Sequence, residues 1–289
     1  MDERSALRML AGAVGGAGDD AAVVDGLVVT TDMLHERTDF PTGTTRYTAG
    51  WRAVGASLSD VAAMGADAVA AVAVYGAPTF DDSALRAFVD GASEVCRSVD
   101  AEYVGGDLDA HDEFTVATTA VGRTDDPVYR AGATPGEEVC VTGTLGRSAA
   151  AVREFERGNA DRGNDLFRFP PRVAAGRRLR GRATAMMDSS DGLARSLHQL
   201  AAASDCGFAV EWDRLPVDAS VDAVARDDAD RRELSAFFGE DFELVFTIPP
   251  DALDSLRASL STPVTRIGEV TDAGVVADGD PLPDRGYSH

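Results

Sequence analysis

The stretch SLSDVAAMGADAVAAVAVY, residues 57–75, decides the fold class of the first half of this 289-residue chain. Its beginning continues a run of small and apolar residues that predicts a helix over residues 47–64. Its end, AVAAVAVY at residues 68–75, is apolar on both alternating faces, which is typical of a strand buried on both sides. A helix that leads into such a strand indicates an α/β fold.

Strands and helices alternate on both sides of this stretch. In the first half we expect strands at 20–24, 27–33, 101–104 and 113–122, a helix over 81–99 and a turn at 105–107. In the second half we expect strands at 137–143, 183–188, 207–212, 242–248 and 264–270, helices over 147–157, 189–203, 218–228 and 251–260, and a surface loop at 156–165. The turn-rich run AGATPG at 131–136 separates the halves. We therefore predict two α/β domains (α+β type), 1–132 and 133–289.

The composition excludes several classes of protein. The net charge is -22, from 49 acidic against 27 basic residues, which argues against nucleic acid or an anionic membrane as a partner. All 27 basic residues are arginines, so a Walker A loop or a Schiff-base lysine is excluded. No uncharged apolar run approaches the roughly 20 residues of a membrane span. We expect a cytoplasmic protein, and the excess of aspartate predicts a halophilic one from a high-salt cytoplasm.

Acidic residues at the ends of predicted strands and turns form the informative pattern. Because Mg²⁺ is a hard cation that takes oxygen ligands, such carboxylates suit Mg²⁺ and nucleotide phosphates. The four histidines show no paired spacing, which disfavours a zinc site. For each single residue the alternative is a helix cap, a turn or solvated surface. The residues placed in this way are Asp19, Asp20, Asp32, Asp60, Asp107, Asp188, Asp191, Glu240 and Asp241.

Two of the candidates can be argued individually. Asp60 interrupts a small and apolar helix, and a buried carboxylate must be paired, ligated or protonated, so we interpret it as functional. Arg130 could offer a guanidinium to a polyphosphate, and the alternative for it is a surface ion pair. The glycine-rich run GAVGGAG at 12–18 lacks the GK[ST] of a phosphate loop and reads as a flexible approach to Asp19 and Asp20.

Seven motifs, taken in order, extend these observations to nearly the whole chain. They are GDDAAV (18–23), TTDM (30–33), SLSDVAAMGA (57–66), GGD (105–107), VYRAGATPGEEVCVTGTLG (128–146), DSSDGL (188–193) and GEDFELVF (239–246). As an ordered set they resemble the thiamine-monophosphate kinase family, of the aminoimidazole-ribonucleotide synthetase-like superfamily. The resemblance implies an N-terminal ATP- and Mg²⁺-binding α/β domain whose sheet pairs in a homodimer, and a C-terminal α/β domain. It implies ATP-dependent phosphorylation of thiamine monophosphate to thiamine diphosphate, the final step of thiamine diphosphate biosynthesis, with several Mg²⁺ ions.

The resemblance also implies roles for single residues. The Mg²⁺ ligands would be Asp20, Thr30, Thr31, Asp32, Asp60, Asp107, Asp188 and Asp191. ATP would be contacted by Gly106, Asp107, Arg130 and Ser190. Thiamine monophosphate would be contacted by Glu240 in GEDFEL, by Tyr287 in the terminal GYSH, and by Asp39, where the family often has histidine. The chain also departs from the family at Ser57, often asparagine, and at Phe238, often glycine.

The expected mechanism follows from what the chain lacks. Without a lysine or a nucleophile triad, a covalent phosphoenzyme has no good carrier, so we expect direct in-line attack by the substrate phosphate on the γ-phosphorus of ATP. One alternative is another activity of the superfamily, such as aminoimidazole-ribonucleotide or selenophosphate synthesis. Selenophosphate synthesis would predict a reactive cysteine near the N-terminus, and none precedes Cys96. The other alternative is a noncatalytic nucleotide-binding protein.

Overall fold

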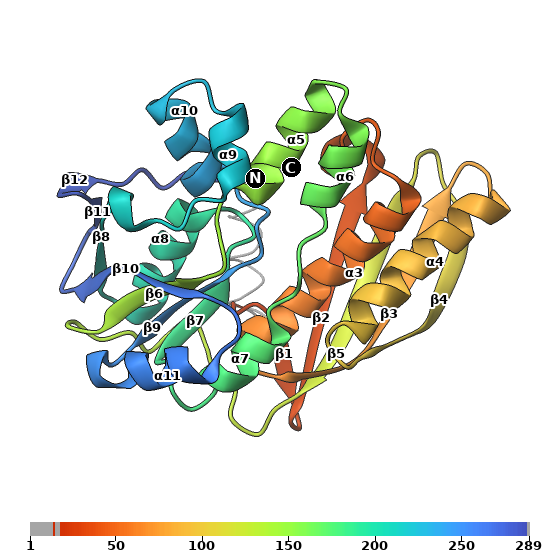
Figure 1. Cartoon of the computed structure of the whole chain (residues 1–289). Coiled ribbons are helices and arrows are strands. Elements are labelled where there is room, and N and C mark those ends of the chain that lie inside the picture. Colours follow the sequence, from red (N-terminus) through yellow and green to blue (C-terminus); the bar gives the residue numbers. More distant parts are fainter. Residues whose placement is uncertain (1–13, 15–17, 288–289) are drawn as a thin grey trace.

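Two β-sheets, each with its own helices, make up the protein (Figure 1). The structure is a computed structural model that describes residue 14 and residues 18–287. The N-terminal sheet has the strand order β1-β2-β5-β3-β4. Its strands are Ala22–Val24 (β1), Leu27–His35 (β2), Asp67–Ala77 (β3), Glu102–Ala110 (β4) and Thr115–Arg123 (β5). This confirms the predicted mixed α/β class.

Helices α3 (Arg46–Ala63) and α4 (Asp82–Arg97) cover one face of the N-terminal sheet (Figure 1). Helix α3 begins where the Thr45 side chain accepts a hydrogen bond from the amide of Thr48. The two helices pack backbone against backbone, because a Cβ atom at Gly50 would lie 2.1 Å from the carbonyl oxygen of Phe88. The small residues that indicated a helix in the sequence therefore also set this close packing. The short helix α2 (Glu36–Asp39) links β2 to α3.

The other face of this sheet exposes apolar side chains. Cross-strand pairing places Met33, Ala117, Val74 and Asp107 in one row, and the row therefore shares one face of the sheet. Met33 and Val74 are 54% and 45% exposed. Contiguous exposed apolar side chains on a sheet are unusual for a surface that faces water, and they favour a contact with another protein surface.

The C-terminal sheet has the strand order β12-β11-β8-β10-β6-β9-β7 and is covered on both faces. Its strands are Glu138–Thr142 (β6), Ala185–Asp188 (β7), Gly207–Val210 (β8), Leu244–Ile248 (β9), Val264–Thr271 (β10), Val275–Ala277 (β11) and Asp280–Pro281 (β12). In β6, Val139 and Val141 pack with α8 (Leu193–Ser204), whereas Cys140 packs with α7 (Val173–Leu179) and α11 (Leu253–Ser259). This alternation is the period-two pattern of a strand between two layers.

Four further helices lie together at the top of Figure 1. They are α5 (Arg147–Glu156), α6 (Ala160–Phe167), α9 (Ala219–Val224) and α10 (Asp228–Arg232), the last two in place of the single predicted helix over 218–228. The structure also has a π-helical turn at Glu233–Phe237 and 3₁₀ turns at Trp212–Arg214 and Pro250–Ala252. The chain turns away after α9, and the Asp227 side chain then caps α10 by accepting from the amide of Asp230.

The predicted surface loop at 156–165 is wrong, because α6 occupies most of it. Asn164 fixes the helix by tertiary contacts: its side chain accepts from the amide of Thr45 at 2.9 Å and donates to the carbonyl of Gly43 at 2.9 Å. Leu166 and Phe167 at its end are buried. Polar composition predicted a loop, and these long-range contacts overrode it.

The predicted turn at 105–107 is also wrong, because β4 continues through it. A Cβ atom at Gly106 would lie 1.7 Å from the carbonyl oxygen of Ala73 on β3. The glycine therefore permits close pairing of two parallel strands and does not mark a reversal of the chain.

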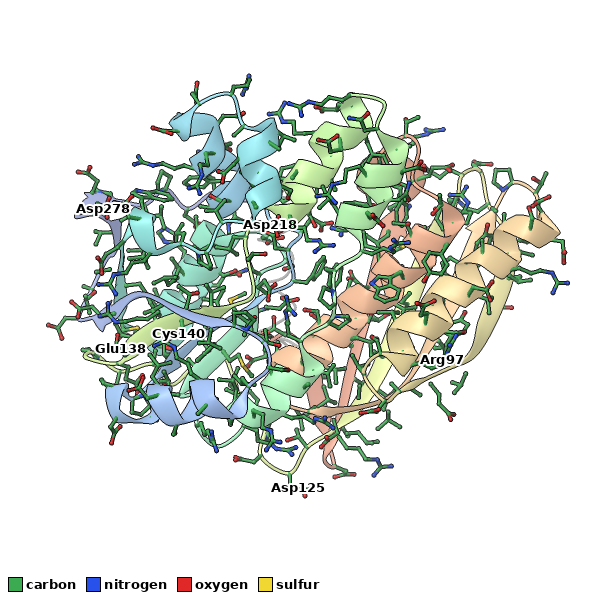
Figure 2. All side chains as sticks on the ribbon, in the orientation of Figure 1. Arg97, Asp125, Glu138, Cys140, Asp218 and Asp278 are labelled. Carbon is green, nitrogen blue, oxygen red and sulfur yellow. The ribbon has the colours of Figure 1, made fainter. Side chains whose placement is uncertain are left out.

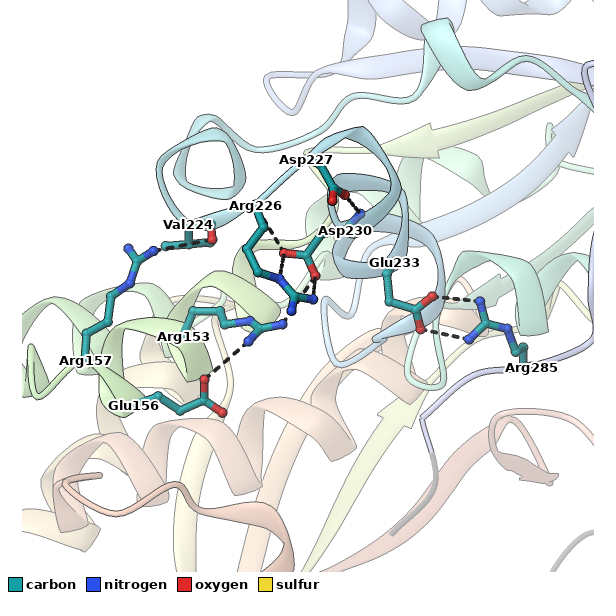
Figure 3. Close-up of polar contacts among 9 residues, drawn as sticks. All are labelled: Arg153, Glu156, Arg157, Val224, Arg226, Asp227, Asp230, Glu233 and Arg285. Carbon is teal, nitrogen blue, oxygen red and sulfur yellow. Dashed lines mark hydrogen bonds and ion pairs between the residues drawn. The ribbon is translucent and has the colours of Figure 1, made fainter.

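Acidic side chains such as Asp125 and Asp278 extend from the periphery of the fold (Figure 2). Where carboxylates are paired, the partner is arginine. In Figure 3, Asp230 accepts a hydrogen bond from Arg226 at 2.6 Å. Glu233 accepts one hydrogen bond from each terminal nitrogen of Arg285, at 2.9 and 2.7 Å. Hydrogen bonds from Arg226 hold the pKa of Asp230 below its usual range.

Within the described residues, no helix is long and apolar enough to cross a membrane.

Candidate functional site

Three carboxylates from distant parts of the chain meet at one point. Asp20 precedes β1, Asp60 lies near the end of α3, and Asp188 ends β7. One oxygen atom from each lies within 4.8 Å of the others, a spacing at which the three could hold a metal ion. The segment before the N-terminal sheet, the helix that covers this sheet and the C-terminal sheet therefore each contribute one acidic group.

Polar neighbours hold these carboxylates in place. The Thr30 hydroxyl donates to Asp60 at 2.5 Å, and the Ser59 hydroxyl donates to Asp188 at 2.6 Å. The guanidinium of Arg130 donates to Asp20 at 2.7 Å, and the Arg130 amide donates to Asp19, also at 2.7 Å. Thr30 and Arg130, both predicted site residues, thus contact the carboxylate group directly.

Burial and mutual repulsion disfavour the charged forms of two of these groups. Burial raises the pKa of Asp60 well above its usual value, and the charges of Asp188, Asp20 and Asp32 raise it further. Burial likewise raises the pKa of Asp188, with Asp20 and Asp32 adding to the effect. Asp32 therefore acts electrostatically on the same site. A bound cation would offset the repulsion among these groups.

Two other predicted Mg²⁺ ligands, Thr31 and Asp107, and the predicted ATP contact Gly106 lie on the N-terminal sheet. Thr31 bonds the carbonyl of Thr118 at 2.9 Å and shares a cross-strand row with Gly105 on β4. Gly106 and Asp107 lie on β4, at the edge of the sheet opposite β1 and β2, and the Asp107 side chain accepts from the amide of Leu108. Within the part of the chain that the structure describes, no hydrogen bond or ion pair joins these three residues to Asp20, Asp60 or Asp188.

The predicted substrate contacts, in contrast, come together. Asp39, Glu240 and Tyr287 all line one cavity of about 930 Å³. Aromatic side chains supply much of its wall, among them Phe238, whose ring centroid lies 5.4 Å from that of Tyr287. A cavity with aromatic and acidic walls fits a flat, positively charged organic ring.

The turn at Asp188–Gly192 joins this cavity to the carboxylate group. The carbonyl of Ser190 accepts from the amide of Glu240 at 2.6 Å, and the carbonyl of Asp191 accepts from the amide of Tyr287 at 2.9 Å. Two predicted substrate residues thus bond to Ser190 and Asp191, which lie two and three positions after Asp188 on this turn. The turn at Asp188–Gly192 therefore connects the carboxylate group, which could hold a metal ion, to the cavity.

Each residue of the EDFE motif has its own contact. Glu240 forms an ion pair with buried Arg52 at 2.5 Å. The carboxylate of Asp241 accepts hydrogen bonds from the amide of Gly146 at 2.5 Å and the amide of Ser148 at 3.1 Å, at the start of α5. The ring of Phe242 stacks on Phe169 with centroids 4.2 Å apart. Glu243 forms a two-point ion pair with Arg172. Of the four residues of this motif, only Glu240 lines the cavity. Burial raises the pKa of Asp241 to about 7.

Asp39 is anchored locally. Its carboxylate accepts from the amide of His35 at 2.6 Å and from the hydroxyl of Thr38 at 2.7 Å, and it is 5% exposed. These bonds hold the start of α2 in place. In the same helix, the backbone carbonyl of Thr38 accepts a hydrogen bond from the Tyr287 hydroxyl at 3.2 Å. The glycine-rich run at 12–18 lies almost entirely outside the described residues.

Sequence reasoning missed Arg52, Ser59 and Phe238 as site residues. Ser59 had a signal, because it directly precedes Asp60. Arg52 had a weaker one, since an arginine within a small-residue helix needs a buried partner just as Asp60 does. Phe238 also had a signal, because it lies two positions before Glu240, but only the folded chain brings its ring to Tyr287.

Comparison with known proteins identifies both halves of the chain. Residues 18–124 match the family model of AIR synthase related protein, N-terminal domain, and residues 134–279 match its C-terminal domain. The chain is 62% identical to thiamine-monophosphate kinase of Halobacterium salinarum over 100% of both chains. It is 32% identical to that of Escherichia coli K12, over 95% of this chain and 91% of the other.

A solved structure agrees with these matches. AaThiL complexed with AMPPCP and TMP superimposes with a TM-score of 0.89 and 26% sequence identity, covering 99% of this chain and 96% of that one. The match in sequence covers 100% of the chain, and the match in fold covers 99% of it.

Proposed function

Because the chain belongs to the thiamine-monophosphate kinase family, we propose that it phosphorylates thiamine monophosphate with ATP, giving thiamine diphosphate and ADP. The observation that carries this proposal is the shared turn between the carboxylate group and the aromatic cavity. A phosphoryl transfer between two bound molecules needs their reacting atoms held in line, and a rigid connection between two subsites serves that need.

The donor subsite would be the carboxylate group. Asp20, Asp60 and Asp188 present oxygen ligands of the kind that Mg²⁺ takes. Burial and mutual repulsion raise the pKa values of Asp60 and Asp188, an effect that a bound cation would counteract. Bound Mg²⁺ would neutralise the charge of the ATP phosphates there. We retain Thr30, Asp32 and Asp191 as candidate ligands, and Arg130 and Ser190 as candidate contacts to ATP. AMPPCP in the AaThiL complex is an analogue of ATP, which supports ATP as the donor.

The acceptor subsite would be the cavity. Thiamine monophosphate carries a positively charged thiazolium ring, and acidic Glu240 with the rings of Phe238 and Tyr287 offers it charge and stacking partners. The TMP of the AaThiL complex supports the same substrate. The attacking phosphate oxygen is already ionised at neutral pH, so no side chain is needed as a strong base.

Turnover and stereochemistry test this proposal together. With Mg²⁺ and ATP, ADP release should require thiamine monophosphate and should be at background with unphosphorylated thiamine. ATP made chiral at the γ-phosphoryl group should give thiamine diphosphate with inverted configuration, because direct transfer is a single displacement. Retention of configuration would refute direct transfer, and absence of turnover with thiamine monophosphate would refute the proposed function itself.

We further propose a homodimer through the uncovered face of the N-terminal sheet, and a domain boundary between residues 132 and 133. The exposed apolar side chains of that face support the dimer; they include Val29, Met33, Val69, Val72, Val74 and Val104. A cytoplasm of high salt concentration fits the charge of -22.

Salt should stabilise the fold. Repulsion among the acidic side chains weakens as the Debye length falls from about 30 Å at 0.01 M to about 3 Å at 1 M salt. We expect the melting temperature to rise by roughly 5–10 °C between dilute and molar KCl, measured by circular dichroism. Sucrose of matched osmolality, which does not screen charge, is the control. Equal melting temperatures in dilute and molar KCl would contradict the halophilic interpretation.

A further inference from the structure

Arg52 is a buried charge for which the proposed chemistry has no direct use. It lies on α3 with 1% of its surface exposed, and its guanidinium carbon lies 3.6 Å from the ring centroid of Phe167. One terminal nitrogen donates to the carbonyl of Phe167 at 2.8 Å, and the other donates to the carboxylate of Glu240 at 2.5 Å and to its carbonyl at 3.1 Å. A buried guanidinium with this many fixed contacts holds its partner in one geometry.

Glu240 needs such support, because its backbone is in the left-handed region, with φ of 63°. Its amide bonds the carbonyl of Ser190, and its carbonyl accepts from the hydroxyl of Ser148 at 2.6 Å as well as from Arg52. Arg52 bonds one carboxylate oxygen of Glu240, and no hydrogen bond to the other oxygen is seen among the described residues. Glu240 lines the cavity, so this second oxygen is available for a ligand there.

The helix that carries Arg52 also carries Asp60. The two residues are eight positions apart on α3, which at 1.5 Å per residue separates them by about 12 Å along the helix axis. Asp60 belongs to the carboxylate group, and Arg52 holds the cavity residue Glu240. A single rigid helix therefore fixes the distance between the two subsites, independently of the turn at Asp188–Gly192.

We propose that Arg52 is a positioning residue that holds the Glu240 carboxylate for the acceptor and so sets the affinity for thiamine monophosphate. This inference rests on the proposed function. Arg52 does not touch the donor subsite, so its loss should impair binding of the acceptor and spare binding of ATP. A purely structural role would instead lower stability and impair both substrates alike.

Steady-state kinetics of the full chain in molar KCl test the proposal. In Arg52→Met, which keeps the apolar volume and removes the guanidinium, the KM for thiamine monophosphate should rise about tenfold or more, while the KM for ATP stays within about twofold. Arg52→Lys keeps the positive charge but not the planar fork, so its KM for thiamine monophosphate should rise less than that of Arg52→Met, to about threefold above wild type, with the KM for ATP unchanged.

Arg172→Met is the matched control. It also removes an arginine that pairs with a buried glutamate of the same motif, Glu243, but neither residue lines the cavity. It should lower the melting temperature without changing the ratio of the two KM values. If Arg52→Met does not fold, an increase of the acceptor KM alone in Arg52→Lys still supports the proposal. An unchanged ratio in every folded Arg52 variant would overturn it, whereas a wild-type chain inactive on thiamine monophosphate would overturn the proposed function beneath it.

Discussion

Asp60→Asn should lower kcat by about 10³-fold and, in metal-free buffer, raise the melting temperature. The loss of activity follows because the substitution removes one of three carboxylate oxygens that could ligate Mg²⁺ while keeping the side-chain volume. The gain in stability follows from electrostatics. Burial and the charges of Asp188 and Asp20 raise the pKa of Asp60, so its ionised form destabilises the folded state at neutral pH, and a neutral side chain removes that repulsion.

The sign of this linkage gives a second measurement. A raised pKa in the folded state means that stability is greatest when Asp60 is protonated and is lost as pH rises through the folded pKa. In the metal-free wild type, the melting temperature should therefore fall as pH rises above the usual pKa range of an aspartate, and Asp60→Asn should reduce that dependence. Mg²⁺ should raise the melting temperature of the wild type and have less effect on the variant.

Asp100→Asn is the control for these measurements. Asp100 is exposed and in the left-handed region, with φ of 61°, a conformation that asparagine adopts readily. It should leave kcat, the melting temperature and the response to Mg²⁺ unchanged. If Asp60→Asn retains wild-type kcat at saturating Mg²⁺, Asp60 is not a metal ligand.

The sequence predicted the elements whose signals are local. The helix α3 and the strand β3 follow from runs of small and apolar residues, and the family is confirmed by whole-length matches. The helix α6 was missed because bonds from Asn164 to Gly43 and Thr45, more than 100 positions away in the chain, fix it. Amino-acid composition does not predict such a long-range contact.

The site divides in the same way. Element ends marked the carboxylates of Asp20 and Asp188, because strand ends place side chains where backbone can approach a ligand, whereas Asp60 was marked by its place within a small and apolar helix. The walls of the cavity and the support of Glu240 by Arg52 could not be predicted, because each joins segments that only the packed fold brings together. The roles of single residues in binding ATP, Mg²⁺ and substrate stay predictions.

The strand order of the N-terminal sheet determines from which copy of the chain Asp107 could act at the carboxylate group. Gly106, Ala73, Thr118 and Asp32 form one cross-strand row, so β4 lies three strand spacings, about 14 Å, from β2. The neighbouring row places Asp107 with Val74 and Met33 on the exposed apolar face, whereas α3, which carries Asp60, covers the other face. If Asp107 serves the same reaction as Asp60, it must therefore do so from a second copy of the chain.

Mixed dimers of Asp60→Asn and Asp107→Asn should consequently recover about a quarter of wild-type activity, although each variant alone is inactive. Random pairing makes half of the dimers mixed. In each mixed dimer, one of the two sites would carry both substitutions and the other would carry neither, because each site takes Asp60 from one copy and Asp107 from the other. Two affinity tags allow the mixed dimers to be purified after co-expression, and the pure mixed dimer should show about half of wild-type activity per chain. If both residues acted within one chain, every site of a mixed dimer would be defective, and activity no higher than that of the parent variants would show that Asp107 does not act from the second copy.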